Sequence, residues 1–521
     1  MGLFYKATRS LLLAALLATL FTGCQSDNKT DKDDEDFLTP KTSKEVTLRF
    51  YVSEDWKNSA LPWRQQHPDI RKVLDEVEKR SKTDVNVRLD FQWIPQQDFF
   101  NTIKTLLDSH DNFDAFVAPV SFPEWSQGLA AENIMLDDLL LDITRLFPDN
   151  APKLYSEFTD VELGEASFKG KLMAIPHHMP GSYRLSAVVR KDMMEKYDIP
   201  EIKSFEDYEV YLKTIKEKED TLIPMTSAYT RHFLETFGYL YQDPYLAYKW
   251  DGSDIKLIPW EQTGDFRTAV ATIKKWHTAK YTYVNGLTRG VEYPVVIDNV
   301  SSYLDTWDNS QRALRTFGNI RIGKNDGLSL AVYPLYPERT AQKAPITGAS
   351  VLFNKNAQNP DRAIRFIEWV ESDQNNYDLF MYGIDGEHYT LKNDMLVLPK
   401  SQLNGNKFPF AGWWGSEAFL NIDLMRGYES DPVNFKEKYK RDAELNSKYS
   451  PLTGFIPDYS TIRELVDKRN ADAGQFEQDI SSPISNTLVD VDEFIQKQKD
   501  GGVGKITEVL QKQIDEWMTK K

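Results

Sequence analysis

The chain has 521 residues, of which 41% are hydrophobic and 12% aromatic, so it holds enough apolar side chains for a large buried core. Its formal net charge of −16 argues against nucleic acid as a partner, because nucleic-acid binding requires a basic surface. A single cysteine leaves no pair for a disulfide, so packing has to stabilise the fold.

The N-terminus has the layout of a secretion signal. Lys6 and Arg9 precede an uncharged apolar run over residues 11–21, and small residues then lead to Cys24. The run is shorter than the roughly 20 residues of a permanent membrane helix. It resembles a bacterial lipoprotein signal, in which the cysteine is diacylated and becomes the first mature residue, although Phe21 stands where leucine is usual. The alternative is a free cysteine buried in a core helix.

The first predicted elements follow a polar segment. We expect residues 1–23 to be a signal peptide and residues 24–44, which are polar and rich in charge, to be a flexible tether. The folded part then alternates between predicted strands and helices, with strands at 46–52, 85–89 and 113–118 and helices near 70–80 and 96–107. This order indicates an α/β domain with a largely parallel sheet.

Strands and helices continue to alternate along the rest of the chain. The further predicted strands cover residues 185–190, 295–297, 328–333 and 351–353. The further predicted helices cover residues 204–218, 266–278, 361–370 and 506–518. Ser204 and Asp207 fit an acidic variant of the capping box at the start of the first of these helices. In α/β sheets, ligands gather at the loops beyond the carboxyl ends of the strands.

Several separated segments resemble family-1 extracellular solute-binding proteins, the lipoproteins that serve ABC importers. These segments are GKLMAIP at 170–176, residues 188–216, 266–286 and 346–372, GIDGEHYTL at 383–391 and VLQKQIDEW at 509–517. They occur in the family's order over nearly the whole mature chain. The last two are similar to a long Gram-positive branch whose usual cargo is oligosaccharide.

The resemblance implies an α/β fold of the periplasmic-binding-protein type, with two lobes, a hinge and a ligand cleft between the lobes. Lobe one would take residues 45–177 and 346–392, and lobe two would take residues 181–343 and 393–521. The expected function is capture of a solute, typically an oligosaccharide, by hinge closure and its delivery to an ABC permease. The protein would be a lipid-anchored monomer on the extracytoplasmic face of a Gram-positive cell membrane, without enzymatic activity, cofactor or metal.

A sugar site needs aromatic rings for the C–H faces and hydrogen-bonding groups for the hydroxyls. The candidate ligand contacts lie in loops near predicted strands, near the hinge, or between glycines: Asp55, Trp56, Ser121, Phe122, Trp125, Tyr183, Asp298, Tyr303, Trp413 and Trp414. Arg184, beside Tyr183, is a further candidate. Adjacent tryptophans at 413–414 cannot easily both be core. For each aromatic residue the alternative is packing in a core or at its edge.

Metal binding and catalysis would each require particular sequence motifs. His177 and His178 are adjacent and cannot easily chelate one ion, and His388 is expected to form structural hydrogen bonds. Residues 251–254 lack the twelve-residue calcium-loop pattern, and the sequence contains no G-x-S-x-G, P-loop or H-E-x-x-H motif. Two alternatives stay open: a cell-surface glycoside hydrolase, and a peptide-binding or sensor lipoprotein of the same fold.

Overall fold

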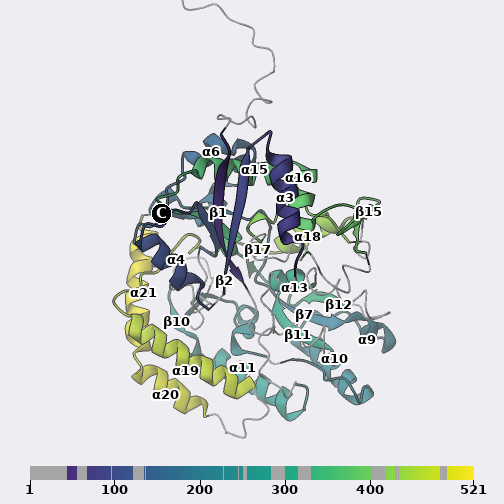
Figure 1. Ribbon diagram of the computed structural model, residues 1–521. Coiled ribbons are helices and arrows are strands. Elements are labelled where there is room, and N and C mark those ends of the chain that lie inside the picture. The colour runs from purple at the N-terminus through teal and green to yellow at the C-terminus, as the bar shows by residue number, and fades with distance from the viewer. Residues whose placement is uncertain are drawn as a thin grey trace, which may run out of the picture.

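The computed structural model describes most of the chain beyond the predicted tether (Figure 1). The described residues are 44–54, 67–95, 97–120, 134, 137–226, 228–243, 246–249, 255–282, 300–314, 330–399, 408, 417–428, 431, 433–481 and 490–520. The predicted signal peptide with Cys24 and the predicted strand 295–297 lie outside them. None of the helices in these ranges combines the length and the apolar character that crossing a membrane requires.

A five-stranded sheet organises the upper part of the molecule in Figure 1, which we call the first body. Its strand order is β2 (Val87–Pro95), β1 (Val46–Glu54), β3 (Ala115–Ala118), β14 (Ser350–Phe353) and β6 (Ala174–Pro176). β1 pairs in parallel with β2 and β3, as the sequence predicts, whereas β14 is antiparallel to both β3 and β6. The sheet is therefore mixed, because the returning strand β14 runs against its neighbours.

Amphipathic helices pack on this sheet. In α3 (Ile70–Ser81), the side chains of Ile70, Val73, Leu74 and Val77 are buried, at the spacing that places them on one helical face. The other helices of the first body are α4 (Phe99–Asp108), α6 (Leu146–Asn150), α7 (Pro152–Ser156), α8 (Asp160–Glu165), α15 (Pro360–Glu371), α16 (Gln374–Tyr382) and α18 (Phe435–Glu444). Apolar side chains of these helices pack into or against one continuous core.

This first core reaches further along the chain than the sequence division suggests. The division changes lobe at residue 393, but the core takes in buried side chains from Leu396 to Ala443. In α18, for example, Phe435, Tyr439 and Ala443 are buried in it. The described elements between 393 and 434, β16 (Met395–Val397) and η6 (Glu417–Phe419), have three residues each, so no periodic pattern in them indicates which body they join.

A three-stranded antiparallel sheet organises the second body, in the lower part of Figure 1. Its central strand is β7 (Leu185–Arg190), flanked by β11 (Ser302–Thr306) and β12 (Leu330–Pro334). Alternate side chains of β7, from Leu185 to Val189, face a second core. The helices of that core are α9 (Lys191–Lys196), α10 (Phe205–Lys218), α11 (Gly264–Thr278), α19 (Arg463–Ser481) and α20 (Val491–Asp500).

A third core lies between the C-terminal helix and a small sheet. The helix α21 (Val503–Met518) buries Val503, Ile506, Leu510 and Ile514 against the sheet of β8 (Tyr239–Asp243), β9 (Leu246–Lys249) and β10 (Ile258–Pro259). The remaining short elements include η1 (Thr230–Phe233), η2 (Glu235–Phe237), η3 (Trp260–Gln262), η5 (Ile346–Gly348), η6 (Glu417–Phe419), β4 (Ser167–Phe168), β5 (Lys171–Leu172), β15 (Thr390–Lys392) and β16 (Met395–Val397).

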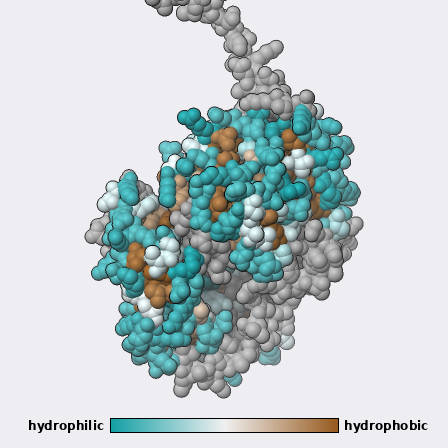
Figure 2. Space-filling model, turned by 60° about the vertical axis from the view of Figure 1, so that its left-hand side comes forward, coloured by the Kyte–Doolittle hydropathy of each residue, from teal (hydrophilic) through white to brown (hydrophobic). Residues whose placement is uncertain are grey.

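The view in Figure 2 shows one face of the molecule. The described surface there is mostly hydrophilic, with small and separate hydrophobic areas, and it is hollowed between its upper and lower parts. The described part of this face therefore shows no single large hydrophobic patch.

Candidate functional site

Within the described ranges, three chain segments pass between the first and the second body, and we call them the crossings. The first crossing, residues 177–184, links β6 of the first sheet to β7 of the second. The second crossing, residues 341–349, returns from the second body to β14 and contains β13 (Ala341–Gln342). The third crossing, residues 445–450, leaves α18 of the first body, contains β17 (Ser447–Lys448) and leads to Leu452 in the third core.

Backbone hydrogen bonds hold the crossings side by side, with the second in the middle. The Tyr183 N–H donates to the Gln342 carbonyl oxygen at 2.9 Å, and the Ala344 N–H donates to the Gly181 carbonyl oxygen at 3.0 Å. On the other side, β13 and β17 pair in parallel. A ribbon this narrow can change its few backbone dihedrals without unfolding either core, which is the usual construction of a hinge.

The first crossing approaches its neighbours closely at Gly181. A Cβ atom at this position would lie 2.7 Å from Asp308 Oδ1 and 2.9 Å from the Ala344 Cβ atom. Asp308 belongs to α13 (Trp307–Ala313), which follows β11. The small residue therefore lets the first crossing, the second crossing and α13 meet at one point.

The adjacent histidines anchor the first crossing to the first body. The His177 Nδ1 atom accepts a hydrogen bond from the Met179 N–H at 3.2 Å. The His178 N–H donates to the Leu420 carbonyl oxygen at 2.8 Å, and the Ile422 N–H donates to the His178 carbonyl oxygen at 3.0 Å. These contacts shape the backbone at the hinge.

A buried carboxyl group touches the second crossing. Glu165, in α8, is 7% exposed, and its Oε2 atom accepts a hydrogen bond from the Ile346 N–H at 3.0 Å. Burial raises the pKa of this carboxyl group to about 8, and nearby Glu162 raises it further, while the Ile346 N–H and the charge of Lys343 oppose the shift. At neutral pH the hinge thus carries a largely protonated carboxyl group.

Two of the ten candidate ligand contacts fall in the described residues. Tyr183 is half-buried on the first crossing. Tyr303, on β11, is 1% exposed and packs with Val188 and Val300 in a small core, because its neighbours Ser302 and Leu304 face the opposite side of the sheet. The other eight lie outside the part of the chain that the structure describes: Asp55, Trp56, Ser121, Phe122, Trp125, Asp298, Trp413 and Trp414. Their grouping around a ligand stays a prediction.

Sequence reasoning missed two features of the hinge. The third crossing has a strand of only two residues, which carries no periodic signal; the positive φ of 48° at Asn446 marks a turn that asparagine tolerates. Arg184 was considered as a ligand contact, but its side chain is 4% exposed and lies within the hinge. An arginine directly before a buried strand indicates a charge that needs partners inside the protein, and this pattern could have predicted the position of Arg184 in the hinge.

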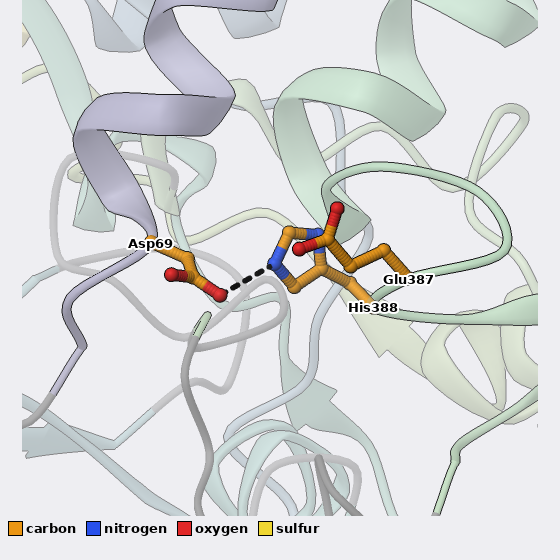
Figure 3. Close-up of side chains that lie close together, drawn as sticks. All are labelled: Asp69, Glu387 and His388. Carbon is orange, nitrogen blue, oxygen red and sulfur yellow. Dashed lines mark hydrogen bonds and ion pairs between the residues drawn. The ribbon is translucent and has the colours of Figure 1, made fainter.

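One cluster of potential metal ligands lies outside the hinge (Figure 3). Asp69, Glu387 and His388 each bring a ligand atom within 4.8 Å of the others. The His388 Nδ1 atom accepts from the Ile384 N–H at 2.9 Å, so in the neutral ring Nε2 carries the proton and donates to Asp69 Oδ2 at 3.3 Å.

The remaining member of that cluster is engaged as well, since Glu387 forms an ion pair with Lys72. A metal ion at His388 Nε2 would have to displace the proton that Asp69 accepts. The expectation that His388 forms structural hydrogen bonds is confirmed: it joins the residue before α3 to the 383–389 segment.

Comparison with known proteins gives one family and a consistent set of structures. The model of the bacterial extracellular solute-binding protein family matches residues 65–377, more than half of the chain. A carbohydrate ABC transporter substrate-binding protein of Streptococcus pneumoniae is 20% identical over 467 residues, which cover 87% of this chain and 89% of that protein.

Among solved structures, the N-glycan transport solute-binding protein NgtS of S. pneumoniae has a TM-score of 0.73 at 17% identity, covering 91% of this chain and 100% of that chain. Its complex with Man5GlcNAc has a TM-score of 0.65 at 17% identity, covering 91% of this chain and 99% of that chain. These likenesses confirm the expected α/β fold of the periplasmic-binding-protein type.

Proposed function

Because the chain belongs to the family of bacterial extracellular solute-binding proteins, we propose that it captures an oligosaccharide by closing about the three crossings and passes it to an ABC permease. The observation that carries the closing step is the narrow ribbon formed by residues 177–184, 341–349 and 445–450. It links two bodies that pack around separate cores, and beside it the Trp307 ring of α13 packs into the first core.

Closure follows from contacts that a ligand makes with both bodies at once. A ligand that touched one body alone would leave the equilibrium between open and closed forms unchanged. We propose that lobe one consists of residues 45–177, 346–392 and 396–443, which share the first core, and that lobe two consists of residues 181–343 and 451–521. Residues 445–450 then form the third crossing.

The carbohydrate cargo is supported by two relatives. The S. pneumoniae protein that aligns with 87% of this chain is named as a carbohydrate transporter component, and a protein of the same fold has been solved with Man5GlcNAc. A site for such a ligand would use aromatic faces and charged hydrogen-bonding groups. The predicted set from Asp55 to Trp414 contains both kinds of side chain.

The attachment to the membrane is the remaining part of the proposal. We propose that Cys24 is lipidated, that residues 24–44 act as a tether, and that the monomeric protein works without enzymatic activity on the extracytoplasmic face. Two observations support this proposal. Residues 1–23 contain basic residues followed by an apolar run and then small residues, and the chain belongs to an extracellular family.

A thermal-shift screen of the protein against a glycan panel that includes Man5GlcNAc tests the cargo. A cognate glycan at a hundred times its dissociation constant should stabilise the folded protein by about 2.7 kcal/mol. Incubated glycans should show no new reducing ends, since release of reducing ends would mean a hydrolase. Stabilisation by a peptide library, with none by any glycan, would contradict the oligosaccharide assignment.

A further inference from the structure

The side chain of Arg184 lies inside the hinge, at the point where the first crossing enters the second body. Its guanidinium group donates three hydrogen bonds to backbone carbonyl oxygens. Nη1 donates to Tyr336 at 2.8 Å, and Nη2 donates to Arg339 at 2.9 Å and to Leu445 at 2.8 Å. These three acceptors account for the position of the Arg184 side chain without a role in ligand binding.

The three acceptors belong to different parts of the chain. Tyr336 and Arg339 lie between β12 of the second body and the second crossing. Leu445 is the residue that ends α18, whose buried side chains belong to the first core, and it begins the third crossing. One side chain therefore ties the end of the first crossing to the approach of the second and to the start of the third.

The backbone of Arg184 adds a further link to the first body. Its carbonyl oxygen accepts a hydrogen bond from the Trp307 N–H at 2.7 Å. The Trp307 ring is buried in the first core and meets the Tyr439 ring of α18 at a centroid distance of 4.8 Å. Arg184 is thus linked to α18 in two ways. Its side chain binds Leu445, which directly follows the helix, and its carbonyl oxygen binds Trp307, whose ring contacts Tyr439 within the helix.

The environment of Arg184 explains why its contacts have to be maintained. A buried guanidinium group is costly unless hydrogen bonds and an opposite charge replace water. Burial raises the pKa of the nearby carboxyl group, Glu235 in η2, well above its ordinary value, so the three carbonyl oxygens replace most of the lost water. Burial lowers the pKa of Arg184 itself, and the charge of Glu235 opposes that shift. Glu338 adds a second favourable charge.

We propose that Arg184 is a positioning residue of the hinge, which sets the relative orientation of the two bodies in the ligand-free protein by binding the third crossing to the second body. The inference rests on the proposed closure about the crossings. Lysine could not reproduce it, because a single ammonium group does not present the planar fork that reaches three carbonyl oxygens.

The experiment measures the distance between the two bodies directly. The full-length chain with Cys24→Ser has no other cysteine, so Lys79→Cys on α3 and Lys213→Cys on α10 give two unique labelling sites. Both lysine side chains are well exposed, at 76% and 66%. The distance distribution is recorded without ligand by pulsed electron paramagnetic resonance, and folding is followed by circular dichroism.

The variants are Arg184→Met, Arg184→Lys and the matched control Arg190→Met. Arg190 is the last residue of β7, the strand that Arg184 precedes, but its guanidinium group pairs with Asp192 within the second body. We expect Arg184→Met to broaden the ligand-free distribution, Arg184→Lys to broaden it less, and Arg190→Met to leave it as in the parent chain. If Arg184→Met does not fold, the comparison of Arg184→Lys with Arg190→Met decides the question.

A purely structural role for Arg184 would give a different result. The melting temperature would fall in Arg184→Met while the distance distribution matched that of Arg190→Met, and this outcome would overturn the inference. Adding Man5GlcNAc and the rest of the glycan panel to the parent chain tests closure separately. If no glycan narrows or shortens the distribution, the capture proposal fails, whereas the effect of Arg184 on the ligand-free protein is still measured.

Discussion

At the scale of single residues, Glu165 makes the hinge sensitive to pH. Its pKa is about 8 in the folded protein and 4.5 in the ordinary case, so the folded state holds a proton that the unfolded chain has released over this interval. The protonated carboxyl group stabilises the fold fully below about pH 4.5, and that contribution is lost as the pH rises to about 8. Over this interval the free energy of unfolding falls by at most ~1.4 kcal/mol per pH unit.

Replacing this carboxyl group by an amide removes the titration and keeps an acceptor for the Ile346 N–H. We expect Glu165→Gln to gain stability relative to the parent chain between pH 5 and pH 8 and to keep a constant difference above that. Urea denaturation at a series of pH values measures the difference. Asp160→Asn, in the exposed first turn of the same helix, serves as the control for replacing an acid by an amide. If the stability difference between Glu165→Gln and the parent chain did not change with pH, the raised pKa of Glu165 would be contradicted.

The candidate site residues show which features local sequence patterns predict and which they do not. Tyr183 and Tyr303 are aromatic residues that the sequence places near predicted strands and the hinge, and it correctly predicts β7 beside Tyr183. It could not tell that Tyr303 lies on the strand β11 itself, opposite Val188, because the strand was expected at 295–297.

At the scale of elements, long periodic segments were predictable and short ones were not. The sequence places β7 at its observed bounds and α10, α11 and α15 within two residues at each end. Each of these elements carries enough residues to repeat its pattern. β13 and β17 have two residues each, and their pairing depends on where the two bodies meet. No local pattern carries that information.

The start of α10 gives a test at this scale. Ser204 Oγ accepts a hydrogen bond from the Asp207 N–H at 3.1 Å, as the sequence predicts, while the Asp207 carboxylate accepts from the Lys203 N–H at 3.0 Å, one residue earlier than a capping box requires. We expect Ser204→Ala to destabilise the protein by about 1 kcal/mol.

Urea denaturation measures this change, and Ser204→Asp is the matched control. Aspartate keeps an oxygen that can accept from the Asp207 N–H, so its stability should stay near that of the parent chain. If Ser204→Ala were as stable as Ser204→Asp, the hydrogen bond at the start of α10 would contribute nothing to the fold.

At the scale of the whole molecule, the order of the family's segments predicted the fold, but it did not assign every segment to a body. The described residues between 396 and 443 follow the 383–391 segment in the chain, yet they contribute Phe419, Tyr439 and other side chains to the first core. This assignment depends on contacts between residues far apart in sequence. The consequence is functional, because it moves the third crossing to residues 445–450, where Arg184 reaches it through Leu445.

The same division into cores separates binding from anchoring. The described side chains of the three cores lie between Leu48 and Ile514, and Cys24 precedes this range in the chain. We therefore expect lipidation and ligand capture to be independent. We expect Cys24→Ser to abolish the membrane-bound fraction in the native host while the purified protein keeps its circular dichroism spectrum and its stabilisation by the cognate glycan. Membrane fractionation and thermal shift measure the two properties, with Ser26→Ala as the control that keeps the cysteine. A Cys24→Ser protein that misfolds would show that the cysteine belongs to the fold, and one that stays on the membrane would show that the attachment lies elsewhere.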